Sequence, residues 1–382
     1  MKKLILCIVI VLSVGCLFFP QKALAQSSDS GYNSATVEQV RSQYTNNDYL
    51  TSNITLKVTS GALQGKTIHA IDTESTTSTQ YYYKPGDNVL FTYSTNSSGK
   101  VTAYIVDFDR RGQLLLLMVL FFALLAFVCR KQGIFSILGM LVSIAVIMWF
   151  LIPQIDAGKD PFILSLIAAF FIIPITYSLA HGIHRKTLVA IISSYITLAI
   201  TTILAYAFLI FANLSTIIPN DELNYIQQTQ GALDLRNLFL AGFVIGAVAV
   251  LNDITISQAS IVRSLYYANK KISINELFSH AMSVGRDHIA SLVNTLILVY
   301  IGVSLPLVIT TFDPSQPVLF DINSQTIALE IVRTFTASIG IVLAVPITTY
   351  VTALVYKKGL LQNVKVPKFL QFGAESHEHI HD

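Results

Sequence analysis

The chain has 382 residues, of which 53% are hydrophobic and only 12% are charged. A soluble domain carries about a quarter charged residues, so the composition excludes an ordinary soluble protein and indicates an integral membrane protein. The net charge of +3 gives no sign of a nucleic-acid partner. The three cysteines, Cys7, Cys16 and Cys129, all lie in apolar runs, which argues against a disulfide framework or a cysteine metal site.

Residues 1–25 have the pattern of a secretory signal peptide. Two lysines precede the apolar run LILCIVIVLSVGCLFF, and the Ala-Leu-Ala at 23–25 fits the small-x-small cleavage rule, so the mature chain would begin at Gln26. A lipoprotein site at Cys16 is disfavoured, because Ser13 takes the position where such sites have Leu and because apolar residues continue after the cysteine. An uncleaved anchor helix stays open as an alternative.

A polar segment and a small β domain are expected next. Residues 26–50 are Ser-rich without clear periodicity and are interpreted as a linker, with at most one helical turn in TVEQVRSQY. Residues 51–109 contain short runs rich in Val, Ile, Thr and Tyr, bounded by Gly and Asn, with a tight turn at KPGD. This pattern predicts a small extracytoplasmic all-β domain, favouring a barrel that resembles the OB fold.

Residues 110–356 are expected to form an all-α membrane domain. Long apolar runs of roughly 20 residues or more are typical of helices that cross a bilayer. We count seven such spans, at 112–130, 133–153, 162–181, 188–212, 237–261, 289–311 and 326–354. The gaps at 213–236 and 263–288 are long enough to hold polar structure.

Lysines and arginines near the span ends predict the orientation. With the N-terminal domain outside, most of them fall on the inner side, at Arg130, Lys131, Arg185, Lys186, Arg263, Lys270, Lys271, Arg286, Lys357, Lys358, Lys365 and Lys368. Arg110 and Arg111 on the outer side are exceptions to this rule. The 357–382 tail is therefore predicted to be cytoplasmic.

The fifth span carries a stripe of small and polar residues. Steps of 4, 3, 4, 4 and 3 place them on one helix face, which consists of Gly242, Gly246, Ala249, Asp253, Ser257 and Ser260. Gly242 and Gly246 have the spacing of close helix–helix contacts, so one interpretation is packing, with Asp253 hydrogen-bonded to a neighbour. The other is that Asp253 lines a proton, ion or solute path, since ionisable residues within spans are rare and often functional.

The sixth span begins with a second polar group. Arg286, Asp287 and His288 lie at its inner edge, and Ser291 shares a face with Asp287 and Asn294. Asn294 is expected at a depth similar to that of Asp253 in the neighbouring antiparallel span, so we predict a direct or water-bridged contact between them. Alternatively, Arg286 and Asp287 are interfacial charges that extend to water. His288 either titrates near neutral pH, which would suit a proton-coupled step, or has a structural role.

Glu330 and Arg333 lie close to the outer end of the seventh span. Their spacing of three residues puts them on one face, where they are predicted to pair and to point away from lipid. Pro174, Pro306 and Pro346 can kink their spans, and kinked helices expose carbonyl groups that often line transporter sites.

The remaining motifs do not indicate enzyme chemistry or a metal centre. His181 and His184 are too few for a metal site, and the tail with His377, His379 and His381 is interpreted as solvated, with loose metal binding as the alternative. The sequence has no Walker-type phosphate loop, no GxSxG and no HExxH. We therefore expect no catalytic residues, no cofactor and no metal.

Several of these stretches resemble the YibE/F-like family of bacterial membrane proteins. They are HGIHRKT, DLRNLFLAG, IGAVAVLNDITISQAS, FSHAMSVGRDHIASLVNTLILVYIGVSLP, EIVRTF and LAVPITT. The resemblance implies a signal or anchor segment, an outer domain and a multi-span bundle in the bacterial cytoplasmic membrane, without a settled activity. The family usually has an acidic residue at the position of Asn252, so this chain keeps one carboxylate, Asp253, where a pair is expected.

Two functions follow as hypotheses. The first is a secondary transporter or permease for a small solute or ion, with an inner site of Asp253, Asn294, Ser257, Arg286, Asp287 and His288 and an outer pair of Glu330 and Arg333. The second is an envelope sensor or assembly factor, whose outer β domain binds a ligand or partner while the helices anchor it. The expected partner is the lipid bilayer, and no nucleic-acid partner is expected. Whether the chain forms a homo-oligomer stays open.

Overall fold

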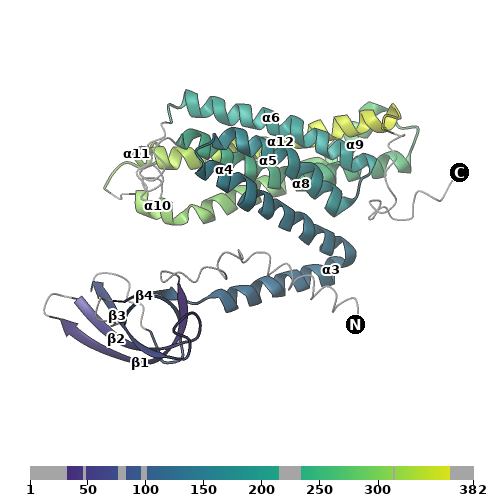
Figure 1. The fold of residues 1–382 in the computed structure, drawn as a ribbon. Helices are drawn as coiled ribbons and strands as arrows, with labels where there is room; N and C mark the ends of the chain where they lie inside the picture. The colour runs from purple at the N-terminus through teal and green to yellow at the C-terminus, as the bar shows by residue number, and fades with distance from the viewer. Residues whose placement is uncertain are drawn as a thin grey trace. The chain divides into compact units, whose positions relative to one another are not determined.

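The computed structural model describes residues 32–45, 49–75, 83–95, 101–214, 234–312 and 315–361. The chain divides into two compact units, Met1–Val128 and Cys129–Asp382. The predicted signal peptide and the histidine-containing tail lie outside the described residues. Figure 1 shows the strands of the first unit and the helices of the second.

The first unit contains a closed five-stranded barrel with the strand order β1-β2-β3-β5-β4. The strands are β1 Asn33–Thr45, β2 Tyr49–Val58, β3 Thr67–Ser75, β4 Asn88–Thr95 and β5 Val101–Phe108. All described pairings are antiparallel except β3 with β5, which pair in parallel at Ala70 and Ala103. The small β barrel predicted from the sequence is thus present.

Alternating residues fill the interior of this barrel, as the two-residue period of strands requires. The buried set comprises Ala35, Val37, Ile54, Leu56, Val58, Ile68, Ala70, Val89, Phe91 and Ala103. The predicted KPGD turn is also present, because the Lys84 amide donates to the Asp87 carboxylate at 2.7 Å and Gly86 takes a positive φ of 97°.

The interpretation of residues 26–50 as a linker was wrong for residues 33–45. This segment is β1, which closes the barrel by pairing with β2 on one side and β4 on the other. Its sequence NSATVEQVRSQYT is polar in part because Glu38, Gln39 and Arg41 are exposed. The bulge between Val37 and Gln39 also interrupts the alternation that reveals a strand. The remaining part of the linker that precedes residue 32 lies outside the described residues.

A cluster of ion pairs follows the barrel directly. Arg110 pairs with Asp107 and Arg111 pairs with Asp109, each at 2.6 Å, and Arg111 also donates to the Ser34 hydroxyl of β1 at 2.5 Å. These are the two arginines that are exceptions to the predicted orientation. Each has an acidic partner, so the pairs add no net positive charge at this point of the chain.

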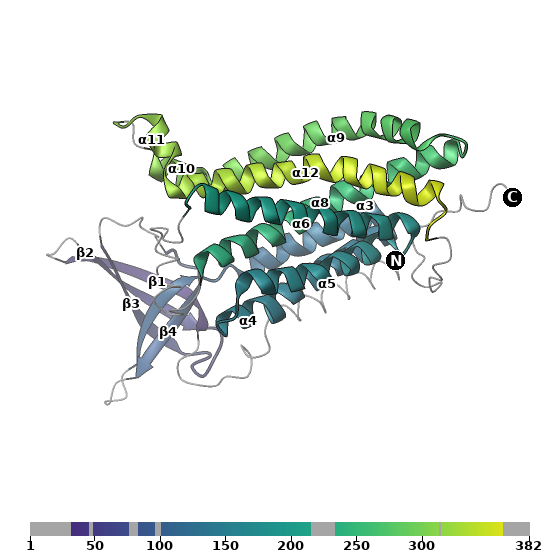
Figure 2. The ribbon, with the colours of Figure 1, turned by 90° about the horizontal axis from the view of Figure 1, so that it is seen from above.

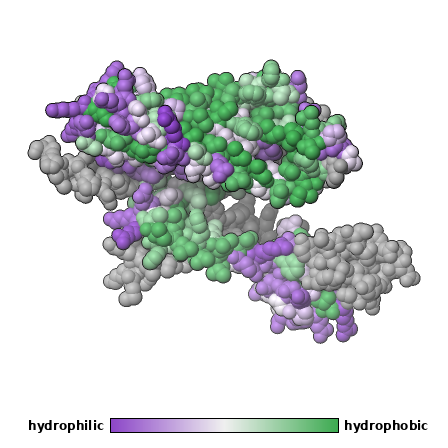
Figure 3. All heavy atoms as spheres, turned by 180° about the vertical axis from the view of Figure 1, so that it is seen from behind, coloured by the Kyte–Doolittle hydropathy of each residue, from purple (hydrophilic) through white to green (hydrophobic). Residues whose placement is uncertain are grey.

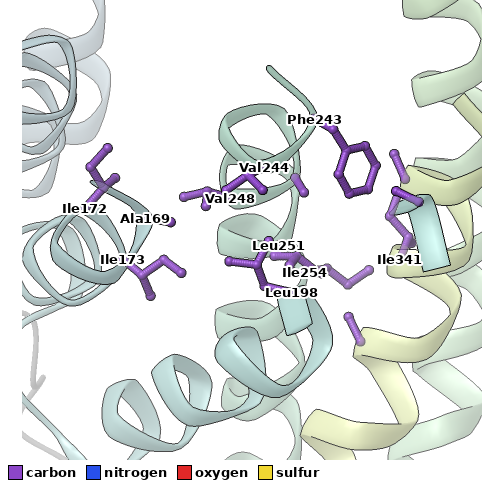
Figure 4. Packing of buried hydrophobic residues seen from close by; sticks show 14 of the residues in the cluster. Ala169, Ile172, Ile173, Leu198, Phe243, Val244, Val248, Leu251, Ile254 and Ile341 are labelled. Carbon is purple, nitrogen blue, oxygen red and sulfur yellow. The ribbon is translucent and has the colours of Figure 1, made fainter. Parts of the chain in front are cut away.

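The helices of the second unit pack side by side around α8 and α12. They are α5 Pro161–His181, α6 Arg185–Phe211, α8 Leu235–Ala268, α9 Ile274–Val303, α10 Leu305–Thr311, α11 Val318–Ile322 and α12 Gln325–Lys357. Helix α8 contacts α5, α6, α9 and α12, and α12 contacts α6, α8 and α9 (Figure 2). Figure 4 shows α8 in the core, where Phe243, Val244, Val248, Leu251 and Ile254 meet α5, α6 and α12.

Five helical segments among the described residues are long and apolar enough to cross a membrane, and the bent pair α9–α10 makes a sixth. The longest, Arg111–Asp156, contains α3 Arg111–Val146, the π-helical turn η1 Ile147–Leu151 and α4 Ile152–Asp156. Its 46 residues are about twice the roughly 20 that one crossing of the hydrocarbon core needs. Arg130 breaks it with a non-helical φ of 52° and ψ of −128°, where the sequence predicts an inner connection. A division into two crossings there, and so a seventh span, stays a prediction.

The 263–288 gap between the fifth and sixth predicted spans is mostly helical. Helix α8 continues to Ala268, and α9 already begins at Ile274. The signal for this early start is the capping box, in which the Ser273 hydroxyl accepts from the Glu276 amide and the Glu276 carboxylate accepts from the Ser273 amide.

The surface of the bundle agrees with a membrane environment. Hydrophobic residues cover its middle and hydrophilic residues gather toward its ends (Figure 3). Several predicted inner-side basic residues lie together at one end, where Arg185 donates to the Val355 and Leu360 carbonyls and Lys357 donates to the Lys270 carbonyl.

Candidate functional site

Helix α8 presents two different faces. The stripe predicted from the sequence lies on its open face, where Gly242, Ala249 and Asp253 are exposed and Gly246, Ser257 and Ser260 are half-buried. The buried residues Phe243, Val244, Leu251 and Ile254 lie on the opposite side. Within the described residues, no hydrogen bond or ion pair engages the Asp253 carboxylate.

A pocket of about 310 Å³ borders this open face. It lies between the second half of α3, α5 and α8, and is lined by Ser136, Gly139, Met140, Ser143, Ile144, Ile147, Ile172, Thr176, Ala180, Ile245, Val248, Ala249 and Asn252. Most of the lining is apolar, with a few polar groups among it, as is usual for small-molecule sites. Asp253 is the next residue after Asn252 and lies one turn beyond Ala249 on the same face.

Two hydroxyl groups and one amide oxygen of the pocket are open to a hydrogen-bond donor. The Ser143 hydroxyl donates to the Gly139 carbonyl at 3.1 Å, and the Thr176 hydroxyl donates to the Ile172 carbonyl at 2.8 Å. Since these protons are already used, the two oxygens keep only lone pairs for a further partner. The Asn252 Oδ1 atom is buried and has no partner among the described residues, which is costly for a buried polar atom.

A hydroxyl cluster on the buried side of α8 joins three helices. Tyr177 of α5 lies 2.5 Å from Ser194 of α6 and 2.9 Å from Thr255 of α8, and Ser194 lies 3.0 Å from Thr255 (hydroxyl oxygen distances). Thr255 also donates to the Leu251 carbonyl at 2.7 Å. All three side chains are fully buried, so this cluster ties the helices together and offers nothing to a ligand.

A second buried contact joins α8, α9 and α12. The Gln258 amide nitrogen donates to the Ala281 carbonyl at 3.1 Å and to the Thr349 hydroxyl at 2.7 Å. Gly285 makes room for this contact, because a Cβ atom there would lie 2.5 Å from Val345 and 3.1 Å from Gln258. These residues were not among those predicted from the sequence. The signal for them was a glutamine within an apolar span, which requires a polar partner.

The predicted packing role of Gly242 was wrong within the described residues. A Cβ atom at Gly242 would meet nothing within 4 Å, and one at Gly246 would meet only the Tyr300 hydroxyl of α9 at 3.5 Å. Close approach occurs elsewhere, at Gly285 and at Gly340 of α12, where a Cβ atom would lie 2.9 Å from Thr201 of α6. Spacing alone did not distinguish the packed glycines from the open ones.

The structure does not join Asp253 to the polar residues of α9. Arg286, Asp287, Ser291 and Asn294 are exposed, and His288 is half-buried. Helix α9 packs on the bundle through a different, mostly apolar face. Leu277, Ala281 and Gly285 of this face are buried, and the residues that pack against the core are Ile289, Leu292, Val293, Leu296 and Tyr300. Within the described residues no hydrogen bond joins Asp253 to Asn294, and Asn294 lies on the exposed face of α9. The direct contact is therefore absent, and the water-bridged one stays a prediction.

The Glu330–Arg333 ion pair is present at 2.7 Å. The two helices α9 and α10 bend by 58° at the break between them. The ion pair lies beside this break, as the hydrogen bond of 3.3 Å from the Ser304 hydroxyl to Glu330 shows. The guanidinium carbon of Arg333 lies 4.6 Å from the centre of the Phe239 ring of α8. The pair thus connects α8, α12 and the break, which is also where the sequence predicts a kink from Pro306.

The described residues hold no group of three or more His, Cys, Asp or Glu side chains that could bind a metal ion. His181 and His184 are linked only through a contact of 3.1 Å between the His184 ring and the His181 carbonyl. Cys129 is a free, exposed cysteine. The other two cysteines and the histidines of the tail lie outside the described residues.

A protein-family model described as YibE/F-like protein matches residues 117–358. The match covers more than half of the chain. The chain belongs to the YibE/F-like family. The resemblance identified from the sequence is confirmed, and the matched region contains α5 to α12, with the pocket, both faces of α8 and the ion pair at the α9–α10 break. No curated protein and no solved structure matches the chain.

Proposed function

We propose that this integral membrane protein is a secondary transporter or permease for a small solute or ion, and that its binding site is the pocket beside Asn252 and Asp253. The observation that carries this proposal is a mostly apolar pocket whose few polar groups include a buried oxygen of Asn252 without a partner among the described residues. Buried polar atoms without partners are rare in proteins, and intramembrane ionisable residues mark substrate and ion pathways.

The chemistry of the pocket favours a ligand that donates hydrogen bonds or carries positive charge. Ser143 and Thr176 present lone pairs, and Asn252 Oδ1 has no partner among the described residues. Asp253 is not part of the lining but lies one turn beyond Ala249, where its carboxylate would add negative charge. The apolar remainder of the lining suits a small solute with a hydrocarbon part. A volume of about 310 Å³ is at the lower end of the range for small-molecule sites.

The break between α9 and α10 is the element that we assign to gating. Helices interrupted within the membrane often change conformation during transport, and here the Glu330–Arg333 pair contacts Ser304 at the break. Loss of this contact would free the break from α12 and from Phe239 of α8. In this proposal the ion pair stabilises the conformation in which α10 is held against α12.

The test is flux through proteoliposomes that contain the purified chain. A panel of inorganic cations, small amines and small alcohols is screened against protein-free liposomes, with a pH-sensitive dye inside to detect coupled proton movement. For any solute that the chain transports, Asp253→Asn is expected to lower the flux at least tenfold, and Asp253→Glu to retain a measurable part. Unchanged flux in Asp253→Asn removes this carboxylate from the mechanism.

The second candidate function is that of an envelope sensor or assembly factor. The observation in its favour is the barrel, which has a closed hydrophobic core of its own and exposes Tyr32, Tyr104 and Val106. Replacing Tyr104 and Val106 by Ser separates the two functions. A transporter keeps its flux after these changes, whereas a sensor loses its response to the envelope ligand or partner.

We also propose the orientation that the charges predict, with the barrel outside the cytoplasmic membrane and the tail inside. Its support is the grouping of Arg185, Lys357 and Lys270 at one end of the bundle and the neutralisation of Arg110 and Arg111 by aspartates. Labelling of a cysteine introduced at Lys358 and of one introduced at Lys57, in intact cells and in inverted vesicles, determines which side each occupies.

A further inference from the structure

Helix α9 has a polar face that the rest of the bundle leaves uncovered. Asp287, Ser291, Asn294 and Leu298 follow one another at steps of 4, 3 and 4 and are all exposed. The face that packs on the core is apolar, so α9 is the most amphipathic of the long helices described. A membrane helix normally turns its polar residues inward, and α9 does the reverse.

Contact with water explains only the first part of this face. Arg286 and Asp287 lie at the edge of the apolar run and can extend to the membrane surface. Asn294 lies seven residues further along the helix, about 10 Å deeper, and its short side chain does not reach the surface from there. Its carboxamide makes no hydrogen bond within the described residues. In lipid, such a group requires a partner from another helix.

We propose that a second copy of this chain covers this face, and that the two α9 helices pack against each other about a two-fold axis along the membrane normal. Two copies inserted in the same orientation bring their α9 helices together in parallel, so residues of equal number face each other. The inference is independent of the proposed transport function. It concerns Asp287, Ser291, Asn294 and Leu298, which we call the α9 outer face.

The α9 outer face is complementary to itself. A carboxamide has both donors and an acceptor, so Asn294 of one copy satisfies Asn294 of the other. Arg286 lies beside this face, one residue from Asp287 and so about 100° around the helix and 1.5 Å away in rise. Its long side chain can reach the Asp287 of the partner at nearly equal depth and so offset the repulsion between the two facing aspartates. A face with one anion and one carboxamide, flanked by the cation of Arg286, suits its own copy better than a uniformly charged partner or a lipid acyl chain.

Cysteine cross-linking in membranes tests the proposal. The native cysteines Cys7, Cys16 and Cys129 are first replaced by Ser. Ser291→Cys and Leu298→Cys then place thiols on the α9 outer face, and Ile289→Cys and Leu296→Cys place matched thiols on the face that packs on the bundle. Membranes from cells expressing two differently tagged copies are oxidised with copper phenanthroline, and the products are separated without reduction.

The expected result is a two-chain product carrying both tags from the Ser291 and Leu298 variants, at least tenfold above that from the Ile289 and Leu296 variants. Asn294→Leu in the Ser291→Cys background should lower the product severalfold, and Asn294→Gln should lower it less. Equal products from both faces indicate random collision and overturn the proposal. So does an adduct with a different protein, or the absence of a product from thiols that a small maleimide can label.

Discussion

The two faces of α8 show two ways in which one membrane helix carries polar residues. On the buried face, Thr255 completes a cluster with Tyr177 and Ser194 in which every hydroxyl has a partner. On the open face, Asn252 has an unpartnered oxygen beside a pocket, and Asp253 has no partner among the described residues. The first arrangement serves packing, because its groups are satisfied within the bundle. The second leaves an acceptor open among the described residues, and our proposal places a ligand there.

The largest expected effect is a difference in stability between alanine substitutions of a packed glycine, Gly285, and of a glycine on the open face of α8, Gly242. Gly285→Ala places a methyl group 2.5 Å from Val345 in the packed region, and such overpacking costs about 1–3 kcal/mol. Gly242→Ala is the matched control, because nothing lies within 4 Å of the added methyl group and alanine favours the helix by up to about 1 kcal/mol. Thermal unfolding in detergent, followed by circular dichroism, should show a clear loss for the first variant and none for the second. Equal losses would mean that the open face is also packed.

The hydroxyl cluster should contribute to stability without contributing to transport. Tyr177→Phe removes the group that contacts both Ser194 and Thr255, and the net loss for such hydrogen bonds is about 0.5–1.5 kcal/mol. The same unfolding measurement reports this loss. For a transported solute, Tyr177→Phe should keep its flux within about twofold, a factor worth roughly 0.4 kcal/mol. A large drop in flux with unchanged stability would place the cluster in the transport path.

The ion pair at the α9–α10 break should show a smaller, pairwise effect. Glu330→Gln and Arg333→Gln each remove one partner of the 2.7 Å contact, and a double-mutant cycle isolates the coupling between them. Both side chains are partly exposed, so a coupling of about 0.5–1 kcal/mol is expected. Unfolding in detergent of the four proteins gives this value. Additive effects of the two substitutions would show that the pair contributes no stability of its own.

The smallest expected effect concerns the start of α3. The Arg111 guanidinium lowers the pKa of Asp109 from 3.8 to about 2 by hydrogen bonding to its carboxylate. Since the folded pKa lies below the unfolded one, this stabilisation is complete above about pH 4 and is lost as the pH falls toward 2. Pepsin is active in this window, so the rate of pepsin cleavage of the barrel should rise more steeply in the wild type than in Asp109→Asn. Parallel pH profiles for the two proteins would contradict this assignment.

The sequence predicted most of the architecture, because the fold depends on features that single residues and short patterns encode. Apolar run lengths located the bundle, and the spacing of Glu330 and Arg333 predicted their ion pair. Strand β1 was missed because a bulge and polar outward residues hide its alternation. The early start of α9 was missed although Ser273 and Glu276 have the spacing of a capping box, which marks the beginning of a helix.

The candidate site was only partly predictable for a different reason. A helical wheel tells which residues share a face, and the stripe through Asp253 is such a face. It does not tell which neighbour that face meets. Asn294 lies at a suitable depth but on the outer side of α9, and Gly242 has the spacing of a packing motif but meets open space. The pocket beside Asn252 depends on α3 and α5, which are far away in the sequence.

The most direct test of the difference between the two faces of α8 compares two alanines. Ala249 is exposed on the open face and Ala247 is buried on the packed face. In the cysteine-free background, Ala249→Cys should react with a charged, membrane-impermeant maleimide, because thiolate formation requires water at that position, and Ala247→Cys should not react. If neither cysteine reacts while a lipid-soluble maleimide labels Ala249→Cys, the open face is covered by lipid, and the proposed binding site beside Asn252 and Asp253 is wrong.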